Sequence, residues 1–352
     1  MEEVSKERLN WHGRYLDNNG IRYFNYSASG FSFKARAKKV EATFVSDASD
    51  FDPLYYCRLG IFVWEGYDDS IEFLPKKLTK SLILDKNETK VTLFNDLEDK
   101  NICIWVIKLS EAQYAYSGLK SIEIEGSIIN SLGAQCEKQR IEVIGDSITS
   151  GYGVEGKDGE IFSTAKENSV LSYAFLLSKR LQCDYSFVSS SGIGLTSHWT
   201  EEDIPDISLL MNNFYPYTDR LMSQRLKLEP EVWDCKRFSP NKIFINIGTN
   251  DASFVKNKED RKLLFIAMYK QLLEMIHRRS PEAEIYCVYG VMEQSLMDSI
   301  RNVVEIFSKE FSHCKIKFIP LELQKEKDGI GQAGHPSIIT QEKICDTIYN
   351  NL

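Results

Sequence analysis

The spacing of apolar residues changes once along this 352-residue chain, near Cys136, and that change constrains the fold more than any other feature. Before it, short segments alternate apolar and polar residues, with turn-forming clusters such as SASG, GYDD and DKNE between them. An alternation of period two is typical of half-buried strands. An antiparallel sandwich of the jelly-roll kind is therefore predicted from FSFKARA, KVEATFVSD, RLGIFVWEG, SLILDK, TKVTLFND, NICIWVIKLS and KSIEIEGSII.

After Cys136, compact apolar strands alternate with helical segments. The predicted strands are RIEVIGDS, DYSFVSSSG, KIFINIGTND, EIYCVYG and KIKFIPLEL. The predicted helices are SVLSYAFLLSKRLQ, residues 260–279, MDSIRNVVEIFSKEF and a last one from Ser337, while residues 193–239 are irregular. This pattern predicts an α/β fold, a parallel sheet with helices on both faces, in which ligands bind beyond the carboxyl ends of the strands. We therefore predict two domains, a jelly-roll β-sandwich at residues 1–135 and an α/β domain at residues 136–352.

Composition and charge exclude several classes of protein. With 43% hydrophobic and 27% charged residues, the chain is globular and neither disordered nor fibrous. A net charge of −8 without a Lys/Arg block disfavours nucleic acid and anionic membrane surfaces as partners. No apolar run is long enough to span a membrane. The charged start, MEEVSKERLNWHGR, has no signal-peptide core, and the eight cysteines form no C-x-x-C pair, so a reduced, cytoplasmic protein is expected.

Three loops that follow predicted strands carry residues suited to acyl transfer. Ser147 lies in GDS, Gly192 lies in SGIG, and Asn250 lies in GTND. Each of these sequences alone is also typical of an ordinary turn. Together, at one edge of a parallel sheet, they offer a hydroxyl, backbone N–H groups and a side-chain amide to one substrate.

His335 is the best candidate for a base. It lies in GHPS, directly before a predicted helix whose N-cap would be Ser337. Among the other four histidines only His198 lies in a plausible active-site loop. The remaining three are His12 in the N-terminal segment, His277 on a charged helix surface and His313 in a turn.

These residues form a complete set for acyl transfer without a metal. The hydroxyl of Ser147 must lose its proton to a base, His335, as it attacks the substrate. The oxyanion that develops needs donors held in advance, each worth about 3 kcal/mol, and we expect the N–H groups of Ser147 and Gly192 and the amide of Asn250 to supply them. The dispersed histidines include no H-x-x-x-H pair, so neither a metal nor another cofactor is predicted.

The blocks GDSI, SG, GTND and GHPS, in this order after successive strands, resemble those of the SGNH (GDSL-type) hydrolases. The resemblance narrows to the family 2 carbohydrate esterases, since YSASGFSFKARAKKVEATF resembles the start of their sandwich domain. RIEVIGDSITSGYG, SYAFLLSKRL, INIGTND and GHPS resemble their catalytic half. The resemblance covers nearly the whole chain. It implies a three-layer, flavodoxin-like SGNH hydrolase domain after a jelly roll, and removal of acetyl groups from plant polysaccharides.

The chain departs from the SGNH pattern at one position. These enzymes usually carry an Asp three residues before the histidine, where this chain has Gln332, and the nearest upstream acid is Asp328. The resemblance allows a Ser–His dyad in which a backbone carbonyl replaces the acid. Because a wrong imidazole tautomer costs about 10⁴-fold in rate, some group must orient the ring. Gln332 is a candidate, through its side-chain oxygen or its main-chain carbonyl, and a distant carboxylate is the alternative.

Together with the expected cytoplasmic location, the resemblance implies an acetylated oligosaccharide derived from mannan or xylan as the substrate. It also implies deacetylation at the 6-O position, with 3-O and 4-O as further positions. Sugar sites use aromatic faces, and Trp199 and Tyr152 are the candidates, whereas Tyr215 and Tyr217 could equally pack their loop onto the body. One alternative function is that of a thioesterase or lipase, which would need a long acyl channel. Another is a carbohydrate-binding protein. The N-terminal domain is expected to shape the cleft, and the oligomeric state stays open.

Overall fold

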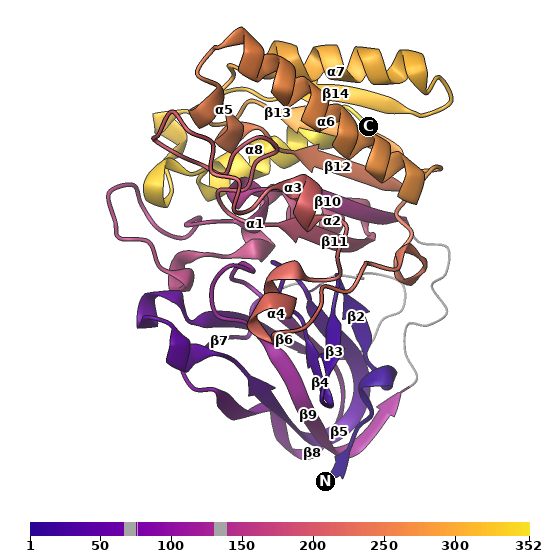
Figure 1. Cartoon of the computed structure of the whole chain (residues 1–352). Helices are drawn as coiled ribbons and strands as arrows, with labels where there is room; N and C mark the ends of the chain where they lie inside the picture. Colours follow the sequence, from indigo (N-terminus) through magenta and orange to yellow (C-terminus); the bar gives the residue numbers. More distant parts are fainter. Residues whose placement is uncertain (67–74, 76, 130–138) are drawn as a thin grey trace.

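The computed structural model describes residues 1–66, 75, 77–129 and 139–352 (Figure 1). It contains an antiparallel sheet of nine strands in the N-terminal half and a parallel sheet of five strands in the C-terminal half. In Figure 1 the indigo-to-magenta sheet lies at one end of the molecule and the parallel sheet with its helices at the other. The predicted boundary between residues 135 and 136 lies outside the described residues and stays a prediction.

Three long strands form the centre of the antiparallel sheet. They are β5 (Gly30–Val45), β8 (Glu88–Lys108) and β9 (Gly118–Ile129), in the order β3-β4-β9-β5-β8-β6-β7, with β1 on β9 and β2 on β5. The sheet curls around an apolar core that includes Phe31 and Ile104, which confirms the jelly-roll-like fold. The shorter strands are β1 (Glu2–Glu3), β2 (Asn10–His12), β3 (Leu16–Asn18), β4 (Ile21–Tyr23), β6 (Cys57–Glu65) and β7 (Lys80–Leu84).

The strand count differs from the sequence prediction for a local reason. FSFKARA and KVEATFVSD form one strand, β5, and TKVTLFND and NICIWVIKLS form one strand, β8. The register of β5 shifts between Ala37 and Lys39 against both neighbouring strands. Such a bulge breaks the period of two while the chain stays in the sheet, so one strand was predicted as two. The short strands β1 to β4 have too few residues to show a period.

The parallel sheet has the strand order β11-β10-β12-β13-β14. Its strands are β10 (Arg140–Gly145), β11 (Asp184–Ser189), β12 (Lys242–Asn246), β13 (Glu284–Tyr289) and β14 (Ile316–Pro320). Alternate residues of β12 face opposite sides. Ile243 and Ile245 join a core with α6 (Glu259–Arg279) and α7 (Met297–Glu310). Phe244 joins a second core with α2 (Tyr173–Leu181) and α8 (Ile338–Tyr349), which confirms the three-layer, flavodoxin-like arrangement.

Helix ends follow local capping. Ser337 accepts the N–H of Thr340 and begins α8, as predicted. Ser172 caps α2, so the segment before it is a separate 3₁₀ turn. The stretch predicted to be irregular contains α3 (Met211–Phe214) and α4 (Arg220–Arg225). The other short helices are α1 (Ser147–Ser150) and α5 (Thr249–Val255). Within the described ranges, no helix is long and apolar enough to cross a membrane.

The prediction that His277 lies on a charged helix surface is wrong. Its side chain is buried, its Nε2 lies 3.2 Å from Nε2 of His313, and its ring packs on Phe311. The last turn of α6 carries two arginines beside His277, which suggested exposure. The contact of α6 with α7 covers the face on which the imidazole lies, and a single helix in the sequence does not reveal that contact.

A buried ion pair joins the N-terminal segment to the parallel sheet. The fully buried Arg14 donates through Nη2 to Oε1 of Glu142 on β10 at 3.1 Å. Its Nη1 donates to the carbonyls of Tyr215 and Tyr217, each at 2.6 Å. The hydroxyl of Tyr215 donates to the other oxygen of Glu142 at 2.8 Å. Tyr215 therefore packs its loop onto the body, which was one of the two readings of its sequence.

We expect Arg14→Met to lower the free energy of unfolding by about 3–5 kcal/mol, because it leaves the buried carboxylate of Glu142 without its cation. Urea unfolding followed by tryptophan fluorescence measures the loss. The matched control is Arg301→Met, which removes an arginine from an exposed ion pair and should cost about 1 kcal/mol or less. Equal losses in the two variants would contradict a supporting role for the Arg14 pair.

Candidate active site

The candidate nucleophile lies at a tight strand-to-helix turn. β10 ends at Gly145, and α1 begins at Ser147, with Asp146 between them accepting the N–H of Ile148 at 3.0 Å. A Cβ at Gly145 would lie 2.1 Å from Oγ1 of Thr149, so this turn requires glycine. Asp146 is fully buried, and burial raises the pKa of its carboxyl to about 7. The turn sets Ser147 at the carboxyl edge of the sheet.

His335 lies directly against this serine. Its Nε2 is 2.8 Å from Oγ of Ser147, and its Nδ1 is 3.1 Å from each of the carbonyl oxygens of Gln332 and Ala333. Carbonyl oxygens only accept, so Nδ1 carries the hydrogen and Nε2 offers its lone pair to the serine. Burial lowers the pKa of His335 to about 4, although both carbonyl contacts act to raise it. The imidazole is therefore neutral at neutral pH.

Of the groups proposed to orient His335, only the main-chain carbonyls reach it. The side-chain amide of Gln332 instead donates to the carbonyl of Ile161 at 2.8 Å. Asp328 pairs with Lys343 at 2.6 Å, on the other side of the loop. A Cβ at Gly153 would lie 2.6 Å from Cβ of Gln332. Gly153 thus permits the close packing that holds the histidine loop, a role that its place in the sequence does not reveal.

Two backbone N–H groups in the site are available as hydrogen-bond donors. Within the described part of the chain, no acceptor pairs with the N–H of Ser147 or of Gly192. The side-chain nitrogen of Asn250 donates to the carbonyl of Ile193 at 2.9 Å and lies 3.4 Å from Oδ2 of Asp146. Since the second contact is long, one amide hydrogen is held only weakly. The three predicted donors are therefore brought to the same place.

A pocket of about 690 Å³ is lined by Ser147, Gly192, Asn250 and His335. Trp199 lines it with 53% of its surface exposed, so a flat apolar face is open to a ligand. The ring of Tyr152 stacks on Phe162 at 3.9 Å and lies 4.4 Å from the ring of His335. The predicted site residues that line the pocket are Ser147, Tyr152, Gly192, Trp199, Asn250 and His335, while Gln332 supports it from behind.

Sequence reasoning missed part of the lining. Gln113 and Tyr114 come from the N-terminal half, from the loop between β8 and β9. Glu293 comes from the loop after β13. The loop SEAQYAYS resembles no motif of acyl transfer, and its tyrosines form no aromatic cluster clear enough to predict a sugar site. The predicted cleft-shaping role of the N-terminal domain is consistent with this wall.

The rival base, His198, also lines the pocket. Its ring lies where a side chain at Gly192 would be, 2.2 Å from the position of that Cβ. Its nearest carboxylate is Asp206, at 3.9 Å. The hydrogen bond to Ser147 is made by His335. His198 therefore covers the glycine turn, which has φ +75° and admits no larger residue.

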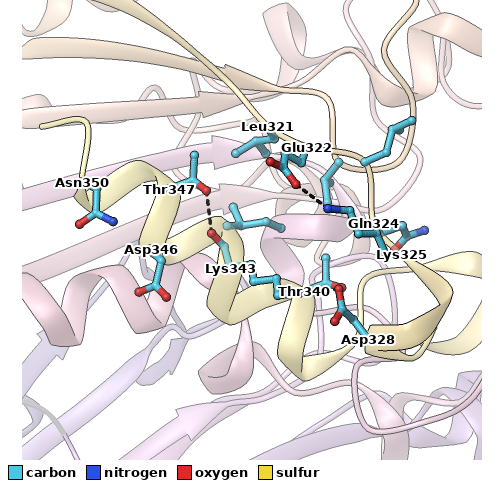
Figure 2. A pocket seen from close by; sticks show the side chains of 13 residues that line it. Leu321, Glu322, Gln324, Lys325, Asp328, Thr340, Lys343, Asp346, Thr347 and Asn350 are labelled. Carbon is cyan, nitrogen blue, oxygen red and sulfur yellow. Dashed lines mark hydrogen bonds and ion pairs between the residues drawn. The ribbon is translucent and has the colours of Figure 1, made fainter.

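A second hollow, of about 280 Å³, lies between α8 and the loop after β14 (Figure 2). It contains none of the predicted site residues, and each charged side chain of its lining is already paired, in Glu322–Lys325, Asp328–Lys343 and Asp346–Arg180. Among the residues that the structure describes, no three His, Cys, Asp or Glu side chains gather closely enough to hold a metal ion.

Comparison with known proteins finds esterases among the proteins that this chain resembles. Residues 143–314 match the GDSL-like lipase/acylhydrolase family. This chain is also similar to two curated relatives. Cellulase/esterase CelE of Acetivibrio thermocellus is 33% identical over 216 residues, and an acetylxylan esterase / glucomannan deacetylase of Cellvibrio japonicus is 32% identical over 159 residues.

These alignments cover 60% and 42% of this chain, but only 25% and 41% of the two relatives. The chain thus spans less than half the length of either protein. A family two carbohydrate esterase from Clostridium thermocellum, solved with cellohexaose, shares the fold with a TM-score of 0.81 over 97% of both chains at 24% identity. The resemblance of the fold to that of a family two carbohydrate esterase is therefore confirmed.

If His335 acts as the base, its protonation must stop the reaction. The active form is the neutral one, so kcat/KM should hold its plateau as the pH falls through 6.5 and decline only near about 4. Initial rates on p-nitrophenyl acetate between pH 3.5 and 8 measure this, with fluorescence confirming that the protein stays folded. A half-loss of activity near pH 6.5 would contradict the buried, neutral imidazole.

Proposed function

We propose that this protein is a serine carboxylic-ester hydrolase that removes O-acetyl groups from manno- or xylo-oligosaccharides derived from plant polysaccharides. The observation that carries the proposal is the 2.8 Å contact between Oγ of Ser147 and Nε2 of His335, with Nδ1 held by two carbonyls. A hydroxyl beside a neutral, oriented imidazole is the arrangement that nucleophilic acyl transfer needs. The carbohydrate-esterase relatives support the choice of substrate.

In the first step, Oγ of Ser147 attacks the acetyl carbonyl carbon while its proton passes to Nε2 of His335. The carbonyl oxygen becomes an oxyanion. It accepts hydrogen bonds from the free N–H groups of Ser147 and Gly192 and from the weakly held amide hydrogen of Asn250. The imidazolium then gives its proton to the sugar oxygen. The ester C–O bond breaks, the sugar leaves with a hydroxyl group, and the serine carries the acetyl group.

In the second step, water takes the place of the sugar. His335 accepts a proton from the water as its oxygen attacks the acetyl-serine, and the same donors hold the second oxyanion. The proton returns to Oγ of Ser147, and acetate leaves. Throughout, the carbonyls of Gln332 and Ala333 would keep the ring in one tautomer and would stabilise part of the charge on the imidazolium.

The pocket suits a sugar better than a long acyl chain. Trp199 offers a half-exposed aromatic face, and Glu293, Lys256 and His198 bring polar groups to the same lining. Sugars stack their apolar faces on aromatic rings and bond their hydroxyls to such groups. A thioesterase or lipase would instead need a long apolar channel. Which hydroxyl is deacetylated depends on how the sugar lies between Trp199 and Ser147.

The first test measures acetate release from acetylated manno- and xylo-oligosaccharides. Ser147→Ala should lower kcat by at least about 10⁴-fold, because the nucleophile is lost. Ser150→Ala, in the same short helix, removes a buried hydroxyl that bonds to Ser189, and this matched control should keep its activity. Activity should also survive a chelator. No release from any acetylated sugar by the folded protein would sink the proposal.

A second variant separates the dyad from a triad with a distant acid. Asp328→Asn should leave kcat unchanged, since the carboxylate pairs with Lys343 and the carbonyls of Gln332 and Ala333 hold the imidazole. Steady-state rates on the preferred oligosaccharide measure this. A loss approaching the roughly 10⁴-fold effect of a wrong tautomer would instead make Asp328 the third member of a triad.

A further inference from the structure

The glycine turn that carries one proposed oxyanion donor is fixed at three points. The carbonyl of Gly192 accepts the N–H of Trp199 at 2.8 Å, and the carbonyl of Ile193 accepts the amide of Asn250 at 2.9 Å. The N–H of Ser191 donates to Oε2 of Glu111 at 2.5 Å. Within the described part of the chain, the N–H of Gly192 has no acceptor and can bind a ligand. The direction of this N–H bond depends on how the three contacts hold the peptide planes on either side of it.

Glu111 belongs to the other half of the molecule. It lies in the loop that follows β8 of the antiparallel sheet, whereas Ser191 follows β11 of the parallel sheet. Glu111 is fully buried. A carboxylate is the kind of acceptor that makes short, charge-assisted hydrogen bonds to backbone N–H groups, as in its bond to Ser191. Burial raises the pKa of the Glu111 carboxyl, whereas the contact with Ser191 acts to lower it.

The backbone of Glu111 is itself held from both sides. Its carbonyl accepts Nζ of the buried Lys108 at 3.0 Å, and its N–H donates to Oε2 of Glu167 at 3.0 Å. Lys108 also donates to the carbonyl of Ala115 and to Oδ1 of Asn25, so its ammonium group has three acceptors. A carboxylate on such a fixed backbone has little freedom. It can therefore fix the group to which it binds.

We infer that Glu111 is a positioning residue for acyl transfer, which holds the N–H of Ser191 and thereby aims the free N–H of Gly192 at the oxyanion. The inference rests on the proposed esterase function and deepens it. It makes the antiparallel half part of the catalytic apparatus, beyond its place in the wall of the pocket. Glu111 does not touch the substrate in this role.

The test compares two variants, made in the full chain, whose side chains are about as long as that of glutamate. Glu111→Gln keeps an oxygen that can accept the N–H of Ser191, and it should retain most of the activity. Glu111→Met offers no such acceptor, and kcat on p-nitrophenyl acetate should fall by about 10²-fold through misplacement of the donor. KM should stay unchanged, because the oxyanion exists only beyond the ground state.

A matched control lowers the stability of the same half at a distance from the loop that carries Glu111. Ile104 lies in the buried apolar core of the antiparallel sheet. Ile104→Ala should lower stability by leaving a cavity, yet keep kcat. If both variants lose kcat alike, or if Glu111→Met changes KM alone, the loss reflects folding or sugar binding and the inference is overturned.

A readout independent of activity covers the case in which Glu111→Met fails to fold. In the ¹⁵N-labelled native protein, the amide proton of Ser191 should resonate downfield and exchange slowly, as expected for a short bond to a carboxylate. Rapid exchange of that proton would overturn the inference whatever the variants do. An active, Ser147-dependent protein in which Glu111→Met matches the wild type would overturn this inference alone. A folded protein without Ser147-dependent acetate release would overturn the proposed function as well.

Discussion

The imidazole of His335 is oriented by two carbonyl groups of its own chain, two and three residues before it, and the proposed chemistry depends on this local contact. For the chain to turn its carbonyls back toward the ring, Ala333 and Gly334 both take left-handed backbone angles, φ +51° and +75°. A left-handed alanine costs about 1 kcal/mol. The packing of Gln332 against Gly153 and the bond from Gln324 to the carbonyl of Gly334 hold the loop in this form.

A carbonyl is a weaker partner than a carboxylate for a positively charged ring. It fixes the tautomer fully but offsets only part of the charge that appears on His335 when it takes a proton. Among the residues that the structure describes, no carboxylate pairs with the imidazole, and the burial of the ring disfavours its charged form. The proposed oxyanion donors therefore carry more of the stabilisation of the transition state than they would in a site with an acid. The precise aim of the N–H of Gly192 matters correspondingly more.

The two halves meet through buried polar contacts as well as apolar packing. Arg14 reaches from the N-terminal segment to Glu142, and Arg225 of α4 donates to the carbonyls of Gln113 and Tyr114 in the loop that lines the pocket. A buried charge without its partner is costly, so such contacts favour one relative placement of the two sheets. The shape of the pocket depends on that placement, since each half contributes a wall. The jelly-roll-like half is thus a structural part of the site.

The sequence by itself determined the classes of the two sheets, the layered parallel fold and the loops that hold Ser147, Gly192, Asn250 and His335. These features are local, because a period of two or 3.6 residues and the ends of parallel strands can be read from short segments. The sequence did not reveal that β5 and β8 are single bulged strands. It offered the main-chain carbonyl of Gln332 as one partner for the histidine but left its side chain and a distant acid as alternatives. It also left Gln113, Tyr114 and Glu111 unmarked. Only the tertiary structure decided their roles, since they come from contacts between segments far apart in the chain, and such contacts leave no periodic trace in it.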